Sequence, residues 1–472
     1  RTPYDRGTWG SLSTPTMVPK VRQAAAAARG LLLQLAADAW AVDPAVLRTR
    51  DGRVQHPDGR RPLTFGELTQ GKELVQTVEG SVAPTAPSDW AVCGTPAPRV
   101  NGRELVTGRH AFASDLSLPD MLHGKILRPA AFGATITTLD LARVRAMPGV
   151  TVVRDGNFVG VAAATDEEAA RALDRIDVEW KVDPQPSHKD LFARLAGTGG
   201  GDQDIPAVTL PPPGKALADR LERADRRFRR TYTADYIAHA PLEPRAALAR
   251  WTDGRLDVWT GAQSPFGTRA ELARTFRIPE GHVRVRVPDT GAGFGGKIRS
   301  AEVAAEAARL SQAAGRPVKV VWSREEEFTW AYFRPAGVLA VESGALADGT
   351  VTAWRFHNYN SGATAMEPPY RFPEPELEFH RADSPLRQGS YRALAATANH
   401  FARESHMDEI ARGLDLDPLD VRLRNLDDPR LIAVLEAAAK RFGWGRKVAG
   451  PDRGVGIACG ATKGSCIAVS YT

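Results

Sequence analysis

The chain has 472 residues, of which 43% are hydrophobic, 25% charged and 7% aromatic, a composition typical of globular proteins. At roughly 100–200 residues per domain, this length predicts about three domains. Lys and Arg outnumber Asp and Glu by 62 to 56, so the net charge is only +6, and no basic strip alternates with aromatic residues. These features argue against a dedicated nucleic-acid-binding protein. The three cysteines, Cys93, Cys459 and Cys466, exclude a disulfide scaffold and an iron–sulfur cluster held by this chain alone.

The first predicted segment covers residues 8–75. A loop rich in glycine and hydroxyl side chains leads into an amphipathic helix over Val18–Trp40, whose apolar residues recur with a period of 3.6. Arg29 and Asp38 interrupt this stretch, so it does not read as a membrane span. A hairpin signal follows at Asp51-Gly52, and a short helix begins at Phe65. Residues 76–98, with four prolines, read as a linker.

The second predicted segment covers about residues 100–182 and alternates short strands with helices. We expect helices over Ala142–Met147 and Asp166–Ile176, the latter capped by Thr165. Strands are expected at 150–154, 157–164 and 177–182. Residues 183–215 contain triple-glycine and triple-proline runs and are expected to form a poorly ordered connector.

The third predicted segment is the largest, about residues 228–444. Its predicted strands are 256–260, 283–287, 318–322 and 350–358, and its predicted helices are 268–276, 301–314, 399–412, 418–424 and 431–442. The chain begins without Met and ends in an apolar alternating run, Ala468–Thr472, that resembles a strand lacking its partner. We therefore expect a piece of a longer polypeptide.

Glycine is most concentrated at Gly291–Lys297 (GAGFGGK), between a predicted strand and a predicted helix. Such density lets the backbone approach a ligand closely and present N–H donors to it. The spacing is neither that of a phosphate-binding P-loop nor that of a dinucleotide-binding fingerprint. A purely structural turn is an equally good interpretation of this motif alone.

Three further motifs are weak individually. His239 and Glu243, in HAPLEP, could form a metal pair, but without a third ligand nearby a pocket-wall role is favoured. GAQSPF (261–266) follows a strand. GSYRAL (389–394) precedes a predicted amphipathic helix, and its arginine could simply bind carbonyl groups.

The order of these motifs resembles one family. HAPLEP, GAQSPF, GAGFGGK, GRPVKVVWSREEEF (315–328), YRALAATANHFARESHMDEIA (391–411) and LDPLDVRLRNL (416–426) are similar to the molybdenum-binding subunit of the xanthine dehydrogenase/aldehyde oxidase family. The opening GTWGSLSTPTM (7–17) resembles the rearranged domain order of the isoquinoline 1-oxidoreductase and nicotinate dehydrogenase β-subunits. The resemblance covers nearly the whole chain.

The resemblance implies an α+β fold: a small hammerhead-type α/β domain plus large mixed α/β molybdopterin-binding domains. The expected boundaries are 1–92 for part of a molybdopterin-binding domain with a linker, 93–185 for the hammerhead domain, 186–215 for a linker, 216–450 for a molybdopterin-binding domain containing the glycine-rich loop, and 451–472 for the start of a further molybdopterin-binding domain.

The resemblance also implies functional residues. Gln263 would face the cofactor, the main chain of Gly293, Phe294 and Gly295 would approach the metal's apical oxygen ligand, and Arg392 would lie beside the metal centre. No residue of this chain is expected to ligate the metal directly. A hydroxyl-rich stretch would contact phosphate and pterin: Thr8, Ser11, Ser13 and Thr14.

Departures from the family pattern bear on the substrate. Purine-oxidising members carry a Glu directly after the Gly-Lys of the glycine loop, where this chain has Ile298, and an Arg where it reads Met366–Pro369. The expected substrate pocket comprises Ile298, Glu367 and Leu394. A purine would leave its hydrogen-bonding groups without partners in this pocket, which would weaken its binding by about 1–3 kcal/mol for each group. An aldehyde or a less polar N-heteroaromatic is therefore favoured over xanthine. The family's general-base Glu would come from a motif beyond residue 472, so no catalytic base is assigned.

The implied activity is oxidative hydroxylation with water as oxygen source. The implied cofactor is molybdopterin with molybdenum, in its cytosine dinucleotide form. Electrons would pass to a small [2Fe–2S] subunit, and in some relatives to a cytochrome c subunit. Further partners are the remainder of its own subunit and a small-molecule substrate, with no nucleic acid. A periplasmic location is favoured over a cytoplasmic one. Two alternatives stay open: a non-catalytic remnant or scaffold chain of the same fold, and a purine dehydrogenase.

Overall fold

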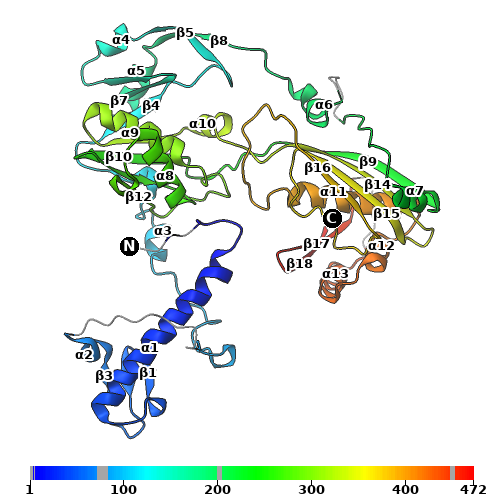
Figure 1. Cartoon of the computed structure of the whole chain (residues 1–472), viewed down its shortest axis with the longest axis horizontal. Helices are drawn as coiled ribbons and strands as arrows, with labels where there is room; N and C mark the ends of the chain where they lie inside the picture. Colours follow the sequence, from blue (N-terminus) through cyan, green and yellow to red (C-terminus); the bar gives the residue numbers. More distant parts are fainter. Residues whose placement is uncertain (1–3, 5, 72–82, 199–204, 447–451, 472) are drawn as a thin grey trace. The chain divides into compact units, whose positions relative to one another are not determined.

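The computed structural model describes residues 4, 6–71, 83–198, 205–446 and 452–471, which form two compact units (Figure 1). The small unit comprises residues 8–111, and the large unit comprises residues 1–7 and 112–472. The domain boundary expected at residues 92 and 93 thus lies within the small unit. No helix among the described residues is both long enough and apolar enough to cross a membrane.

The small unit is built around one long helix, α1 (Val18–Trp40), which has the predicted bounds. Its last turns bury Ala36 and Ala37 against Leu47, Val54 and Leu68, apolar residues contributed by the chain that follows. A capping box at Thr64 starts the next helix. The remaining elements are η1 (Ser13–Met17), η2 (Pro44–Val46), β1 (Arg48–Arg50), β2 (Arg53–Gln55), β3 (Leu63–Thr64), α2 (Phe65–Thr69), η3 (Pro87–Asp89) and α3 (Gly102–Val106).

A seven-stranded mixed sheet forms one half of the large unit, in the order β12-β11-β10-β13-β4-β7-β6. The strands are β4 (Leu122–Ile126), β6 (Thr151–Asp155), β7 (Phe158–Ala163), β10 (Ala246–Thr252), β11 (Arg255–Thr260), β12 (Val283–Arg286) and β13 (Val318–Val321). The parallel pair β4–β13 joins strands from the predicted second and third segments into one sheet, with Val318 opposite Leu122.

Helix α9 (Ala301–Ala314), with the predicted bounds, packs closely on this sheet because glycines in the strands leave room for it. A Cβ at Gly124 would lie 2.5 Å from Leu310 Cδ1, and one at Gly160 would lie 3.2 Å from Leu310 Cδ2. Also in this half are η4 (Ala113–Asp115), α8 (Pro265–Phe276), η6 (Glu280–His282) and α10 (Arg324–Thr329), and, around a separate small core, β5 (Thr135–Asp140), α4 (Ala142–Arg145), α5 (Asp166–Leu173) and β8 (Asp177–Lys181).

The second sheet of the large unit has four strands in the order β16-β15-β14-β9. They are β9 (Arg226–Ala234), β14 (Gly337–Ala345), β15 (Val351–Tyr359) and β16 (Glu376–His380). Alternation along β14 sends Leu339 and Val341 into the core shared with α11 (Ala396–Gly413), while Val338 and Ala340 pack on the opposite side. The elements α12 (Pro418–Asn425), α13 (Pro429–Phe442), β17 (Gly456–Thr462) and β18 (Ser465–Tyr471) complete this half. The α+β class is confirmed.

Two sequence predictions need correction. The expected poorly ordered connector contains η5 (His188–Asp190) and α6 (Leu191–Ala196), whose Phe192 and Leu195 are buried beneath β14; α7 (Lys215–Glu222) begins at its end. Its glycine and proline runs concealed this apolar patch, although residues 199–204 lie outside the described residues. The final run does not lack a partner either, because β18 pairs antiparallel with β17 along its length and the hairpin joins the α11 core.

Candidate active site at the glycine-rich loop

The glycine-rich loop lies at one edge of the seven-stranded sheet because of strand topology. β11 and β12 are parallel neighbours, so the chain leaves both strands at the same edge. There residues 261–263 meet residues 291–297. Two further segments, 239–243 and 389–394, complete what we call the glycine-loop junction.

Gln263 holds the loop through its side-chain oxygen. Oε1 accepts hydrogen bonds from the N–H groups of Gly295, at 3.1 Å, and Lys297, at 3.2 Å, while the N–H of Gln263 donates to the carbonyl of Lys297 at 2.9 Å. A Cβ at Gly293 would lie 2.7 Å from Oε1. The side-chain oxygen of Gln263 thus fixes the loop backbone, and the contact of this side chain with the cofactor stays a prediction from the resemblance.

Glu243, paired with His239 in the sequence as a possible metal pair, instead binds the loop. Its Oε2 accepts from the N–H of Gly291, at 2.9 Å, and from Lys297 Nζ, at 2.7 Å. Both side chains are buried. Burial lowers the pKa of Lys297, and the carboxylate of Glu243 opposes this shift only in part.

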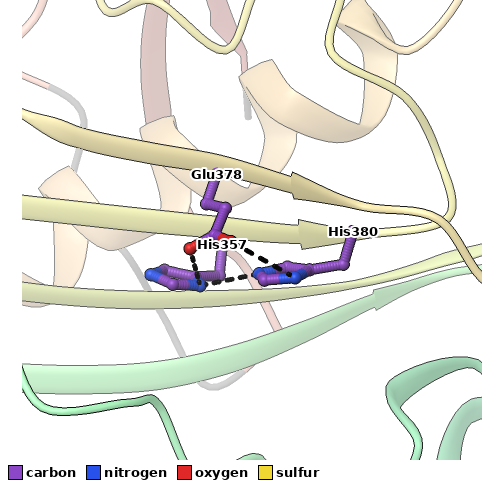
Figure 2. A group of neighbouring side chains, drawn as sticks. All are labelled: His357, Glu378 and His380. Atoms are coloured by element: carbon purple, nitrogen blue, oxygen red, sulfur yellow. Dashed lines mark hydrogen bonds and ion pairs between the residues drawn. The ribbon is translucent and has the colours of Figure 1, made fainter.

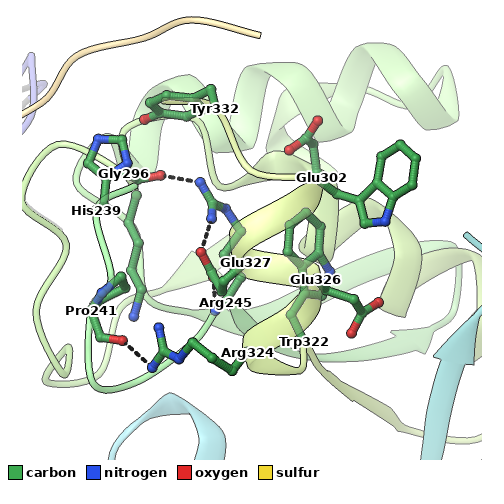
Figure 3. Close-up of polar contacts among 12 residues, drawn as sticks. His239, Pro241, Arg245, Gly296, Glu302, Trp322, Arg324, Glu326, Glu327 and Tyr332 are labelled. Atoms are coloured by element: carbon green, nitrogen blue, oxygen red, sulfur yellow. Dashed lines mark hydrogen bonds and ion pairs between the residues drawn. The ribbon is translucent and has the colours of Figure 1, made fainter. Parts of the chain in front are cut away.

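Arg245 binds the loop at the carbonyl group of Gly296 (Figure 3). Its guanidinium is buried, donates to the carbonyl of Gly296 at 2.6 Å and pairs with Glu327. The hydroxyl of Tyr332 donates to the carbonyl of Gly295. These contacts fix carbonyl groups on one side of the loop.

Gly295 is required by a loop-to-loop contact. With φ at +102°, it adopts a conformation that favours glycine, and a Cβ there would lie 2.5 Å from the carbonyl oxygen of Ser390. The same carbonyl accepts from His239 Nε2 at 2.6 Å. The close neighbour of Gly295 is therefore protein backbone.

Arg392 contacts the loop at Phe294. Its N–H donates to the carbonyl of Phe294 at 2.8 Å, and its exposed guanidinium stacks 4.4 Å from the centre of the Phe294 ring. Ala292 and Phe294 both have positive φ, and the N–H groups of Gly293 and Phe294 have no acceptor among the described residues. Successive main-chain donors of this kind suit an anionic ligand.

A cavity of about 440 Å³ adjoins the junction. Ile298 and Leu394, expected in the substrate pocket, both line it, although they are far apart in sequence. Glu367 is exposed and is not part of this lining. Sequence reasoning missed other members of the wall, which carry no motif: Arg299, Tyr332, Arg334, Ser361 and Gln388.

The hydroxyl residues expected to contact the cofactor lie in the small unit. All four are exposed, and Ser11 has a positive φ of 58° just before the turn that starts η1. They are Thr8, Ser11, Ser13 and Thr14.

Two buried carboxylates, those of Glu243 and Glu404, could be considered as general bases, but other groups of the protein already bind them. Glu243 binds the loop, as described. Glu404 lies in what we call the α11 polar core, accepting at 3.0 Å from each of Arg403 and Arg422 and at 2.9 Å from the hydroxyl of Tyr370. Burial alone would raise the pKa of Glu404, but the two arginines outweigh it and hold the pKa below its usual value.

Comparisons with known proteins identify a cofactor-binding domain in the part of the chain that contains the glycine-rich loop. Residues 212–426 match the molybdopterin cofactor-binding domain. A nicotinate dehydrogenase chain of Pseudomonas putida is 31% identical over 94% of this chain, and the beta chain of isoquinoline 1-oxidoreductase of Brevundimonas diminuta is 26% identical over 93%. The chain spans only 40% and 64% of the lengths of these two relatives.

Solved structures show the same fold. Quinoline 2-oxidoreductase from Pseudomonas putida aligns with 74% of this chain and 54% of its own, at a TM-score of 0.63 and 24% identity. The sequence comparisons, the domain match and this shared fold confirm the resemblance. The chain matches the molybdopterin cofactor-binding domain at residues 212–426 and is similar over nearly its whole length to molybdenum-binding subunits of the xanthine dehydrogenase/aldehyde oxidase family.

Proposed function

We propose that this chain is part of a molybdenum hydroxylase that hydroxylates an aldehyde or N-heteroaromatic, with water as the oxygen source. The observation that carries the proposal is the coincidence of the matched molybdopterin domain, residues 212–426, with the glycine-loop junction and its adjoining cavity. A bound molybdopterin would supply the two-electron oxidation of the substrate carbon.

The residues present fit such a cofactor. A pyrophosphate-bearing group needs many donors, and the N–H groups of Gly293 and Phe294 have no protein acceptor among the described residues. Arg392 adds an exposed guanidinium at the same place. We infer that the cofactor binds along this face of the loop in its cytosine dinucleotide form. Thr8, Ser11, Ser13 and Thr14 lie in the small unit, and their contacts with phosphate and pterin stay a prediction from the resemblance.

The chain's own residues would act by positioning. Gln263, Glu243 and Arg245 fix the loop backbone, so its donors need no rearrangement when a charged group arrives. Ile298 and Leu394 would exclude water from one wall of the substrate cavity. The resemblance implies that the general base comes from a part of the subunit outside this chain, and Glu243 and Glu404 are already bound by other groups.

Partners follow from the same proposal. Electrons would leave through a small [2Fe–2S] subunit, with a cytochrome c subunit as a further acceptor. A scaffold chain of the same fold is the competing interpretation. Metal analysis of the purified complex separates the two, since about one molybdenum per chain is expected for the enzyme and none for the scaffold.

The residues that line the cavity support a choice among substrate classes. Ile298 occupies the position where purine-oxidising members carry a carboxylate, while the wall also holds Arg299 and Arg334. Arg334 is buried, and its Nε has no partner among the described residues. A heteroaromatic bearing a carboxylate suits such a wall better than a neutral one.

The test compares kcat/KM for xanthine, benzaldehyde, isoquinoline and nicotinate with an artificial dye acceptor. We expect xanthine to be poorer by on the order of 10³-fold, because two charge-assisted contacts are missing. Ile298→Glu alone should not restore it, since that change supplies only one of the two missing contacts. Xanthine turnover equal to that of the other substrates would overturn the substrate assignment.

A further inference from the structure

A cluster of chemically reactive side chains lies outside the proposed active site, on the four-stranded sheet. β15 and β16 are parallel neighbours, with His357 opposite Glu378 and Tyr359 opposite His380. Because strand residues alternate between faces, Glu376, Glu378 and His380 lie on the same face of the edge strand. None of these residues lines the substrate cavity.

The two imidazoles face one another (Figure 2). His357 Nδ1 lies 2.8 Å from His380 Nε2, and the carboxylate of Glu378 lies 3.7 Å from a nitrogen of each ring. One ligand atom from each residue lies within 4.8 Å of the other two. His380 stacks on the ring of Tyr359, with centroids 4.4 Å apart, which fixes its orientation.

The hydrogen-bond partner of His357 Nε2 determines which ring nitrogen carries the proton. It leaves the lone pair of Nδ1 facing the cluster. Nε2 lies 3.2 Å from Glu376 Oε1, an oxygen that also accepts from the guanidinium of Arg355. A carboxylate paired with a guanidinium acts as an acceptor, so Nε2 carries the proton and Nδ1 presents its lone pair to His380 and Glu378. A carboxylate behind a ligating imidazole is the usual outer partner in zinc sites.

Charge and exposure also suit a cation. The carboxylates of Glu342 and Glu376 both pair with the guanidinium of Arg355, and the carboxylate of Glu378 faces the two imidazoles. The His357 side chain is fully buried, whereas His380 is 28% exposed and Glu378 is 53% exposed. An ion could therefore enter from solvent and reach a ligand anchored in the sheet.

We propose that His357, Glu378 and His380 bind one divalent transition-metal ion of the zinc class, which ties the edge strand β16 to β15. Two imidazoles and one carboxylate leave the fourth tetrahedral position to water. Metal–ligand bonds of about 2.0–2.1 Å place ligand atoms roughly 3.3 Å apart. His357 Nδ1 and His380 Nε2 would therefore separate by about half an ångström, and the carboxylate of Glu378 would approach His357 Nδ1 by a similar amount. The exposed side chain of Glu378 can make that movement.

The experiment titrates the chelator-treated intact protein with Co²⁺, whose visible absorption reports tetrahedral coordination. We expect the intense absorption of one tetrahedral ion per chain, lost in His380→Ala and Glu378→Gln. Glu376→Gln should weaken binding about 10–100-fold by releasing the outer partner. His282→Ala, which removes an exposed histidine outside the sheet, is the matched control and should bind as the unchanged protein does.

A variant that gains a spectroscopic band distinguishes the loss of a ligand from the loss of folding. His380→Cys keeps three ligands and should add the near-ultraviolet charge-transfer band of a cobalt–thiolate bond. Zn²⁺ should raise the Tm of the unchanged protein and of His282→Ala but not of His380→Ala. Tetrahedral absorption of equal strength in His380→Ala, or no such absorption in the unchanged protein, would overturn the proposal.

Discussion

The glycine-loop junction and the α11 polar core both bury a carboxylate, but they use it differently. Glu243 accepts from a main-chain N–H and a lysine, and so joins loops. Glu404, on α11, accepts hydrogen bonds from Arg403 of the same helix, from Arg422 of α12 and from Tyr370. It therefore joins α11 to α12 and to the segment that contains Tyr370. The first arrangement positions backbone donors, and the second holds a hydrophobic core together. Substitutions in the junction should therefore affect ligand binding, and substitutions in the polar core should affect stability.

Gly295→Val gives the sharpest test of the junction. The new Cβ would lie 2.5 Å from the carbonyl oxygen of Ser390, so the two loops must separate, and we expect complete loss of bound molybdenum and molybdopterin. Far-UV circular dichroism should change little, because the strain is confined to the two loops. Gly254→Val is the matched control, since it has a positive φ of 71° but nothing within 4 Å of its Cβ. Full molybdenum content in Gly295→Val would contradict the assigned role.

Glu404→Gln should have the largest effect on stability. It removes the carboxylate bound to buried Arg403 and leaves buried Arg422 with Asp408 alone, at a cost of about 3–5 kcal/mol in the free energy of unfolding. Denaturant titration measures this cost. Asp420→Asn, which removes an exposed carboxylate from α12, should change stability by much less. Equal stability in the two variants would remove the distinction between the regions.

Stability should also fall in acid because of His406, a buried residue of α11 whose Nε2 lies 2.9 Å from the hydroxyl of Ser343 on β14. Burial lowers the pKa of His406 to about 3, against about 6.5 when unfolded. The unfolded chain therefore binds the extra proton first, and stability is full above pH 6.5 and is lost as pH falls toward 3. Between pH 6.5 and pH 5 the loss should be about 2 kcal/mol. His406→Gln should flatten the dependence of Tm on pH, and an unchanged slope would contradict this assignment.

The smallest effect is expected at Arg392. Arg392→Lys keeps the main-chain bond to Phe294 but loses the guanidinium stacked on that ring, worth about 0.5–1 kcal/mol. Thermal unfolding should barely change, while molybdenum content should fall measurably because the planar donor is gone. A fall in Tm as large as that of Glu404→Gln would place Arg392 among the stability-determining residues.

Local signals predicted part of the fold well. The bounds of α1 and α9 follow from a clear 3.6-residue period, and Thr165 caps α5 as predicted. β14 was missed because both of its faces are buried, so it shows no alternation. The pairing of β4 with β13 depends on contacts between distant segments, which no local pattern encodes.

The site was predictable only in part. The glycine density indicated a close backbone approach, but the resemblance alone suggested that Ile298 and Leu394 share a pocket. The buried Arg334 in the wall carried no motif. The cluster of His357, Glu378 and His380 depends on the register of two strands, and neither strand's sequence reveals which residue of its neighbour it faces.

The β4–β13 pair also has a consequence for synthesis. β7 can pair with both β4 and β6 as soon as these strands leave the ribosome, but the other edge of β4 must wait for a partner about 200 residues further along. At about 5–20 residues per second this delay lasts roughly 10–40 s. For that time the nascent chain presents an unpaired strand edge, the feature that most readily recruits another chain. Conditions that slow elongation between residues 164 and 317 should therefore increase aggregation without altering the finished protein.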